Sequence, residues 1–200
     1  MLFVTACDDN YFVYALAQIW AVERLFKQYP IVYDLGLCSD YKGYLKGLGI
    51  ELRHHPSEPD KGKDYPSDYQ PMALFKPTLL LDACTRYMGA IVYLDADAKP
   101  MQHFEFPAKD LGLARVDNWD RSLYTGPVHS GVIFLSNTNK RMSFLLDWAK
   151  DLWNDCLPSD KKSLNRIVPH ADMELTELPA REYNARMVHP ETKIFHQRVI

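Results

Sequence analysis

The chain has 200 residues, of which 47% are hydrophobic and 24% are charged, and its formal net charge is −3. This length fits one domain with a substantial core, so we expect a single domain over residues 1–200. The slightly acidic balance, without a Lys/Arg cluster among aromatic residues, argues against nucleic acid as a partner. No apolar stretch approaches the roughly 20 residues of a membrane span and no basic leader is present, so we expect a cytoplasmic protein without a transmembrane segment.

The N-terminal part of the chain alternates between strand and helix patterns. Strands are expected over residues 2–6, 31–37 and 50–53. The first helix follows the candidate N-caps Asp8, Asp9 and Asn10, and its apolar residues recur at helical spacing at Phe12, Leu16, Ile19, Val22 and Phe26. A short helix is expected over residues 41–48. This alternation predicts an α/β fold whose single, mostly parallel sheet is flanked by helices on both faces.

The middle of the chain leads to the most informative segment. Residues 56–69 lack periodicity and are expected to form a surface loop. Pro77 suits the first turn of a helix over residues 78–88, which would place Lys76 at the helix entrance. An apolar strand then begins at Ala90 and runs directly into Asp95 and Asp97.

Asp95 and Asp97 are candidate metal ligands. A continuous run of apolar residues predicts a strand buried on both faces, and ligands bind at the carboxyl ends of such strands in open α/β sheets. Alternate residues on an extended backbone point the same way, so the two carboxylates would share one hard cation, Mg²⁺ or Mn²⁺. An Asp-x-Asp triplet by itself is weak evidence, because a strand end followed by a polar turn has the same sequence.

The remaining elements follow from shorter patterns. Strands are expected over residues 111–114, 132–135 and 194–200. One face of an amphipathic helix is traced by Met142, Leu145, Leu146, Ala149, Leu152, Trp153 and Cys156. Between these elements, Asp117 and Asp160 each lie near a strand end, where they are candidates for hydrogen bonds to a substrate or for acid/base catalysis. The alternatives are a polar turn around Asp117 and a helix cap formed by Ser159 and Asp160.

Several segments, in this order, resemble the GT-A glycosyltransferases, and in particular the glycogenin-like and lipopolysaccharide galactosyltransferase-like members of family eight. The resemblance rests on residues 3–11, 32–37, 75–77, 92–97, 129–134, 159–165, 178–184 and 194–196. Two positions depart from the family pattern, because His129 replaces an Asn and Lys161 replaces a Gln. The Gly-x-x-Lys that follows the family's histidine is not found between Gln197 and Ile200.

The resemblance implies a GT-A fold and a site for a nucleotide-sugar, with a UDP-sugar as the favoured donor, an unknown acceptor and retention of anomeric configuration. Asp95, Asp97 and His196 would ligate Mn²⁺ or Mg²⁺, and Asp160 and Asp117 would be the catalytic candidates. The residues implied in nucleotide-sugar binding are Thr5, Ala6, Asp9, Tyr11, Lys76, Asp95, Ser130 and Gly131. For His196, the competing interpretation is a histidine that is hydrogen-bonded within the core, and for Lys76 it is a solvated lysine at the start of a helix.

Two other functions are compatible with the sequence. The departures at His129 and Lys161 are also expected of a nucleotide-sugar-binding protein that has lost transfer activity. A nucleotidyltransferase ranks lower, because that class places a glycine-rich, basic loop after its first strand, whereas Cys7-Asp8-Asp9-Asn10 is acidic here.

Overall fold

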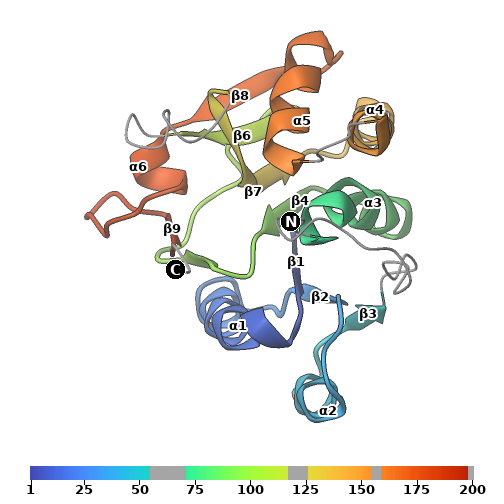
Figure 1. Ribbon diagram of the computed structural model, residues 1–200. Helices are drawn as coiled ribbons and strands as arrows, with labels where there is room; N and C mark the ends of the chain where they lie inside the picture. Colours follow the sequence, from blue (N-terminus) through green and yellow to red (C-terminus); the bar gives the residue numbers. More distant parts are fainter. Residues whose placement is uncertain (55–70, 117–125, 155–158, 198–200) are drawn as a thin grey trace.

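A computed structural model describes residues 1–54, 71–116, 126–154 and 159–197 (Figure 1). The predicted loop over residues 56–69 and the candidate Asp117 lie outside the described residues. The N-terminal elements are β1 (Leu2–Cys7), η1 (Asp9–Tyr11), α1 (Phe12–Phe26), β2 (Ile31–Asp34), α2 (Ser39–Gly47) and β3 (Leu52–His54). Asp8 caps the first helical turn, since its carboxylate accepts the N–H of Tyr11 at 3.1 Å. These elements confirm the predicted alternation of strands and helices.

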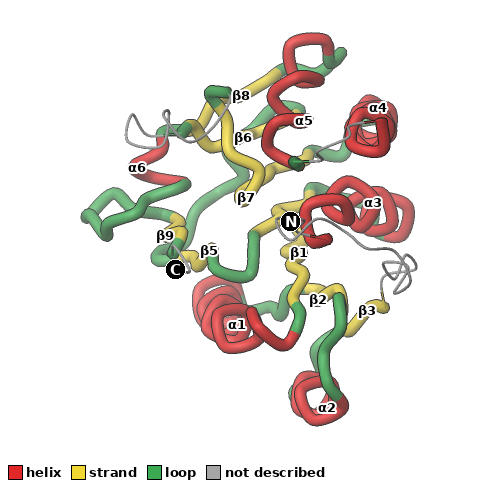
Figure 2. The backbone as a smooth tube through the Cα atoms, in the orientation of Figure 1, coloured by secondary structure: helices red, strands yellow, loops and turns green. Residues whose placement is uncertain are grey.

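The remaining elements complete two sheets. They are α3 (Pro71–Arg86), β4 (Ile91–Leu94), β5 (Ala98–Pro100), β6 (Leu111–Arg115), β7 (Val128–Leu135), α4 (Lys140–Asn154), α5 (Asp160–Ile167), η2 (Val168–His170), β8 (Leu175–Leu178), α6 (Ala180–Tyr183) and β9 (Ile194–His196). The larger sheet has seven strands in the order β3-β2-β1-β4-β7-β6-β8. Only β7 runs antiparallel to its neighbours among these strands, which confirms the mostly parallel sheet. The smaller sheet pairs β5 with β9, as Figure 2 shows.

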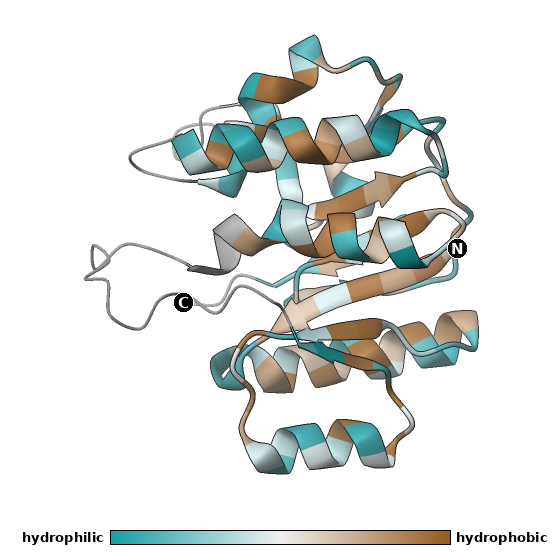
Figure 3. Cartoon of the chain, turned by 90° about the vertical axis from the view of Figure 1, so that its right-hand side faces the viewer, coloured by the Kyte–Doolittle hydropathy of each residue, from teal (hydrophilic) through white to brown (hydrophobic). Residues whose placement is uncertain are grey.

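Helices cover both faces of the large sheet. On one face, α3, α4 and α5 pack over strand residues such as Val4 and Ile91; on the other, α1 and α2 pack over residues such as Val32 (Figure 1). The strands are the most hydrophobic part of the chain, and the helices alternate between hydrophobic and hydrophilic residues (Figure 3). Burial of these apolar faces is the main force that holds the layers together. None of the helices in the described part of the chain combines the length and the hydropathy that a transmembrane span requires.

The start of α3 differs from the prediction. The helix begins at Pro71 and carries Pro77 in its interior, so Lys76 lies within the helix rather than at its entrance. A proline inside a helix removes a backbone hydrogen bond, but here apolar residues on both sides of it, Phe75 and Leu79, are buried in the core. The packing of the helix therefore outweighs the local preference of proline for a first turn.

Further features of β7, α4 and β8 differ from the sequence prediction. β7 begins at Val128, so the segment from His129 to Gly131 is part of the strand. In α4, Leu146 and Trp153 are 57% and 68% exposed, so they lie off the buried face on which they were expected. The strand β8 was not predicted, because two of its four residues are polar and it lies at the edge of the sheet.

Candidate metal centre

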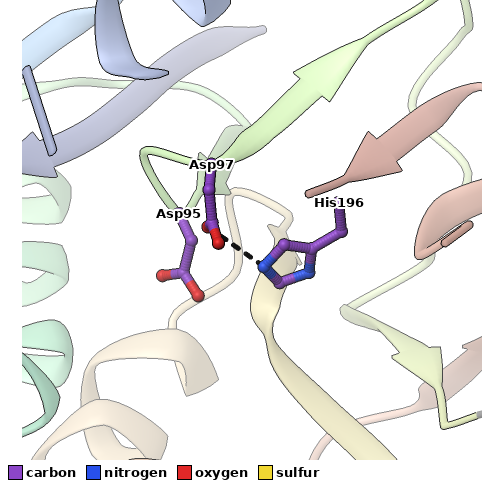
Figure 4. A group of neighbouring side chains, drawn as sticks. All are labelled: Asp95, Asp97 and His196. Atoms are coloured by element: carbon purple, nitrogen blue, oxygen red, sulfur yellow. Dashed lines mark hydrogen bonds and ion pairs between the residues drawn. The ribbon is translucent and has the colours of Figure 1, made fainter. Parts of the chain in front are cut away.

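Asp95, Asp97 and His196 come together at the carboxyl end of β4. One ligand atom from each of the three side chains lies within 4.8 Å of the other two, and the side chains converge on the same point (Figure 4). Pairing of β5 with β9 brings the histidine to the carboxylates, because Ala98 lies directly opposite His196. The small sheet thus joins ligands that are far apart in the sequence.

The two carboxylates are close for a different reason than the sequence suggested. The strand β4 ends at Leu94, and Asp97 lies in a turn closed by a hydrogen bond of 2.8 Å from the N–H of Ala98 to the carbonyl of Asp95. The extended backbone assumed in the prediction is therefore absent at Asp97. The turn, and not the alternation of a strand, sets the spacing of the carboxylates.

The imidazole of His196 is oriented by Asn184. The Nδ1 atom of His196 lies 2.8 Å from Oδ1 of Asn184, and an amide oxygen only accepts, so Nδ1 carries the proton and donates. The Nδ2 atom of Asn184 donates to the carbonyl of Arg115 at 3.4 Å, which fixes this orientation of the amide. The Nε2 atom of His196 then faces Oδ1 of Asp97 at 3.1 Å. A partner on the second ring nitrogen is typical of histidines that bind metals.

Gly131 leaves open the space between Asp95 and His196. A Cβ atom at this position would lie 2.6 Å from Oδ2 of Asp95 and would collide with the ring of His196. Two carboxylates and an imidazole around this space are a suitable donor set for Mn²⁺, and the carboxylates also suit Mg²⁺. The residues present therefore fit the divalent cation that the sequence predicts.

Lys76 is buried and holds two acidic side chains. Its Nζ atom lies 2.9 Å from Oδ1 of Asp95 and 2.6 Å from Oδ2 of Asp160, and it donates to the carbonyl of Ser130 at 3.2 Å. An ammonium group has three donors, so these contacts use all of them. Burial by itself lowers the pKa of Lys76, but the two carboxylates outweigh it and raise the pKa above its ordinary value. Lys76 is thus charged, and its hydrogen-bond donors are used by other groups of the protein and not by solvent.

Asp160 is placed beside this lysine at the start of α5. Burial acts to raise the pKa of Asp160, but the charge of Lys76 and hydrogen bonds from Lys76, from the side chain of Ser130 and from the N–H of Lys161 lower it. The preceding Ser159 is the N-cap of α5, as the alternative interpretation of this segment predicted. The capping role and the contact with Lys76 coexist, and they keep Asp160 ionised.

The segment from His129 to Gly131 lines the same region. His129 is 5% exposed, its Nδ1 atom accepts the N–H of Gly131 at 2.9 Å, and its ring centroid lies 4.8 Å from that of His196. Burial is the main cause that holds the pKa of His129 well below its ordinary value, and the charges of Lys161 and Lys76 act in the same direction. A neutral His129 therefore carries its proton on Nε2, because Nδ1 is an acceptor.

The residues expected to contact the nucleotide lie around the end of β1. Thr5 and Ala6 are buried within the sheet, whereas Asp9 is exposed and Tyr11 is half-buried. Oδ1 of Asp9 accepts the N–H of Cys38 at 2.7 Å, which links η1 to the start of α2. Burial, followed by the charge of Asp97, raises the pKa of Tyr11. Asp9 and Tyr11 are accessible here, and the side chains of Thr5 and Ala6 are covered.

Two residues that support the candidate ligands were not expected from the sequence. Tyr93 donates its hydroxyl proton to Oδ1 of Asp95 at 2.9 Å, and Asn184 holds His196. The first has a sequence signal, because Tyr93 lies two residues before Asp95 and alternate residues of a strand share a face. The role of Asn184 has no signal within its own segment, since its partner His196 lies in another element.

Comparison of the fold with solved structures identifies its class. No family model matches the sequence, and no curated protein matches it either. A glycosyltransferase involved in the glycosylation of the major capsid of PBCV-1 matches with a TM-score of 0.59 and 13% identity, over 98% of this chain and 92% of the other. The galactosyltransferase LgtC, in complex with donor and acceptor sugar analogs, matches with a TM-score of 0.58 and 16% identity, over 98% and 86%.

Part of a larger protein has a similar fold. The bifunctional glycosyltransferase WbbM matches with a TM-score of 0.63 and 16% identity over 98% of this chain, which spans 45% of the WbbM chain. The order of helices and strands and these three likenesses establish the GT-A glycosyltransferase fold. The fold class predicted from the sequence is thereby confirmed.

Proposed function

We propose that this protein is a metal-dependent glycosyltransferase that moves a sugar from a nucleoside-diphosphate sugar to an acceptor, with a UDP-sugar as the favoured donor. The cluster of Asp95, Asp97 and His196, at the carboxyl end of β4, carries the proposal. Ligands bind at this edge of open α/β sheets. The GT-A fold supports the reaction class, and the likeness to LgtC, whose structure holds donor and acceptor sugar analogs, supports the two kinds of substrate.

The chemistry of the site follows from its charges. When bound, Mn²⁺ or Mg²⁺ stabilises the negative charge that grows on the diphosphate as the glycosidic bond breaks. Asp97 and His196 present one ligand atom each, and Asp95 presents Oδ2, since its Oδ1 is held by Lys76 and Tyr93. Because Asn184 and Lys76 already fix two of these side chains, little reorganisation is needed on binding.

Asp160 is proposed to act on the donor sugar. Lys76 lies between Asp95 and Asp160, so the metal ligand and the catalytic candidate are held at a fixed separation. An ionised Asp160 accepts hydrogen bonds from sugar hydroxyls or stabilises positive charge at the reacting carbon, and it does not act as an acid. Asp117 remains the second catalytic candidate, Ser130 and Gly131 the sugar contacts, and Thr5, Ala6, Asp9 and Tyr11 the nucleotide contacts. We also propose that the anomeric configuration of the sugar is retained, because the family resemblance implies it.

Titration calorimetry with UDP tests the proposal. We expect Mn²⁺ to tighten UDP binding to the wild-type protein, and Asp97→Ala to abolish the effect of the metal while metal-independent binding persists. Asp147→Ala, which removes an exposed carboxylate of α4, is the control and should behave as the wild type. The proposal is contradicted if the wild type does not bind UDP, or if it binds UDP equally tightly with and without Mn²⁺.

A binding protein without transfer activity is the second candidate. Its support is Lys161, which is 8% exposed and whose charge acts on His129, beside the metal ligands. An additional buried cation near the donor sugar opposes the positive charge that develops at the reacting carbon. Donor hydrolysis separates the two functions: a transferase releases UDP from a UDP-sugar in the presence of Mn²⁺, whereas a binding protein holds the donor intact across a panel of acceptors.

A further inference from the structure

Gln18 is a polar residue on the buried face of α1. It is fully buried, and its neighbours on that face, Ala15, Ile19 and Val22, are apolar. Its Nε2 atom lies 2.6 Å from the carbonyl oxygen of Asp95 and 2.8 Å from the carbonyl oxygen of Ala98. A buried amide in an apolar face is costly unless it is hydrogen-bonded, so these contacts explain how the residue is tolerated.

The chemistry of the amide fixes its orientation. An amide NH₂ group has two hydrogens, and here it faces two carbonyl oxygens, so each hydrogen has one acceptor. The reverse orientation would place Oε1 against both carbonyls, where no hydrogen bond forms. In the adopted orientation Oε1 is buried and has no hydrogen-bond partner among the described residues. The orientation of the amide is therefore set by the two hydrogen bonds of its NH₂ group and not by a contact of Oε1.

The two carbonyls lie at the two ends of the turn that carries the metal ligands. Asp95 begins the turn, Asp97 lies within it, and Ala98 ends it and pairs with His196 across the small sheet. The amide of Gln18 thus binds the backbone of the candidate ligand Asp95 directly. It also binds the backbone of Ala98, which is the strand partner of the third candidate ligand, His196. Asp97 is enclosed between these two points, and its carbonyl accepts the N–H of Gln197 at 2.9 Å.

We propose that Gln18 is a positioning residue for the metal centre: it holds the turn over residues 95–98 and the adjoining strand pair in the arrangement in which all three ligand side chains converge. The proposal rests on the metal site of the proposed function. Gln18 does not touch the metal, and it acts through the backbone of the ligands. Without its two hydrogens, the carbonyls of Asp95 and Ala98 each lose a donor and the turn is free to relax, which separates the carboxylates from His196.

The test uses Gln18→Met, which keeps an unbranched side chain of similar size and removes both donors. We expect the folded variant to bind Mn²⁺ alone about 10- to 100-fold more weakly than the wild type, the range for residues that support metal ligands. The dissociation constant is measured by electron paramagnetic resonance of free Mn²⁺, at a temperature where every variant is fully folded by circular dichroism. Gln18→Asn, which keeps the amide on a shorter side chain, replaces Gln18→Met if that variant does not fold.

Arg141→Met is the matched control. Arg141 is also buried and donates to the carbonyls of Cys84, Tyr87 and Gly89, but these precede β4, at the opposite end from the ligands. The control loses buried hydrogen bonds and stability and is expected to keep the Mn²⁺ affinity of the wild type. The proposal is overturned if folded Gln18 variants bind Mn²⁺ as the wild type does, or if Arg141→Met weakens binding equally. A wild type that binds no Mn²⁺ refutes the proposed function itself.

Discussion

Acidic residues lie at the carboxyl ends of two parallel strands of this sheet, β2 and β4, and the protein binds their oxygens in different ways. At β2, one oxygen of Asp34 accepts the N–H groups of Gly36 and Leu37, at 2.9 and 2.7 Å, and the other lies 2.7 Å from Nζ of Lys42. At β4, Oδ2 of Asp95 borders the space that Gly131 leaves open, and Oδ1 of Asp97 lies 3.1 Å from Nε2 of His196. A carboxylate at a strand end is therefore available to a cation only where the protein has not already occupied its oxygens.

The backbone of the two turns explains this difference. Gly36 has a φ of 122°, which lets the turn after β2 direct its N–H groups back to Asp34. In the turn after β4, the N–H of Asp95 donates to the carbonyl of Gly131 and the N–H of Ala98 to the carbonyl of Asp95, while Gln18 and Gln197 donate to the carbonyls of Asp95 and Asp97. The first turn closes on its own acidic residue, whereas the carboxylates of the second turn contact side chains from other segments: Lys76 and Tyr93 at Asp95, and His196 at Asp97.

Removal of the lysine should distinguish the two strand ends, and the largest effect is expected for Lys76 at β4. Lys76→Met leaves Asp95 and Asp160 without their common cation in a buried site, so we expect a loss of about 3–5 kcal/mol in the free energy of unfolding at pH 7. Burial without Lys76 raises the pKa of Asp160 in the folded variant, so the loss shrinks as the pH falls toward 4. Urea unfolding at several pH values measures it.

Lys42→Met is the corresponding change at β2. The side chain of Lys42 is 35% exposed, and the backbone N–H groups stay on Asp34 after its removal. We therefore expect a loss of no more than about 1 kcal/mol. Equal losses for the two lysine variants would contradict the distinction between a closed and an open strand end.

A smaller effect is expected at the second ring nitrogen of His196. Asn184→Leu removes the acceptor of Nδ1, so the tautomer and the orientation of the imidazole are no longer fixed, and Mn²⁺ affinity should fall about 10- to 100-fold. Asn184→Asp keeps an acceptor oxygen at this place and should retain the affinity of the wild type. Calorimetry with Mn²⁺ compares them, and unchanged binding by Asn184→Leu would show that Asn184 has no part in the metal site.

The sequence predicts the parts of the site that depend on local patterns. The apolar strand before Asp95, the first helix and the order of strands and helices follow from periodicity, and the structure brings Asp95, Asp97 and His196 together as expected. The location of Lys76 was wrong, because the preference of Pro77 for a first turn is weaker than the burial of α3. Local patterns thus identify Asp95 and Asp97 as candidate ligands, and the family resemblance adds His196, but neither indicates the way in which their neighbours hold them.

The contacts that hold the ligands are the ones that local patterns do not predict. Gln18 is separated from Asp95, and Asn184 from its partner Arg115, by long stretches of chain, so both contacts depend on the packing of distant elements. Gln18 does leave a trace, since a glutamine interrupts an otherwise apolar helix face. Such a residue indicates a buried hydrogen bond, but the sequence alone does not indicate its partner.

The smallest effect is expected for Asp34→Asn, which tests the closed strand end directly. Burial acts to raise the pKa of Asp34, but the hydrogen bonds from Lys42 and from the N–H groups of Gly36 and Leu37 outweigh it and lower the pKa. A lowered pKa stabilises the fold above the unfolded value of about 3.9, and the contribution is lost as the pH falls through the folded value. Because asparagine still offers an oxygen to the two N–H groups, we expect a loss of about 1 kcal/mol at pH 7 that disappears in acid, measured by urea unfolding. Mn²⁺ affinity should not change, and a weaker affinity would show that the two strand ends are coupled.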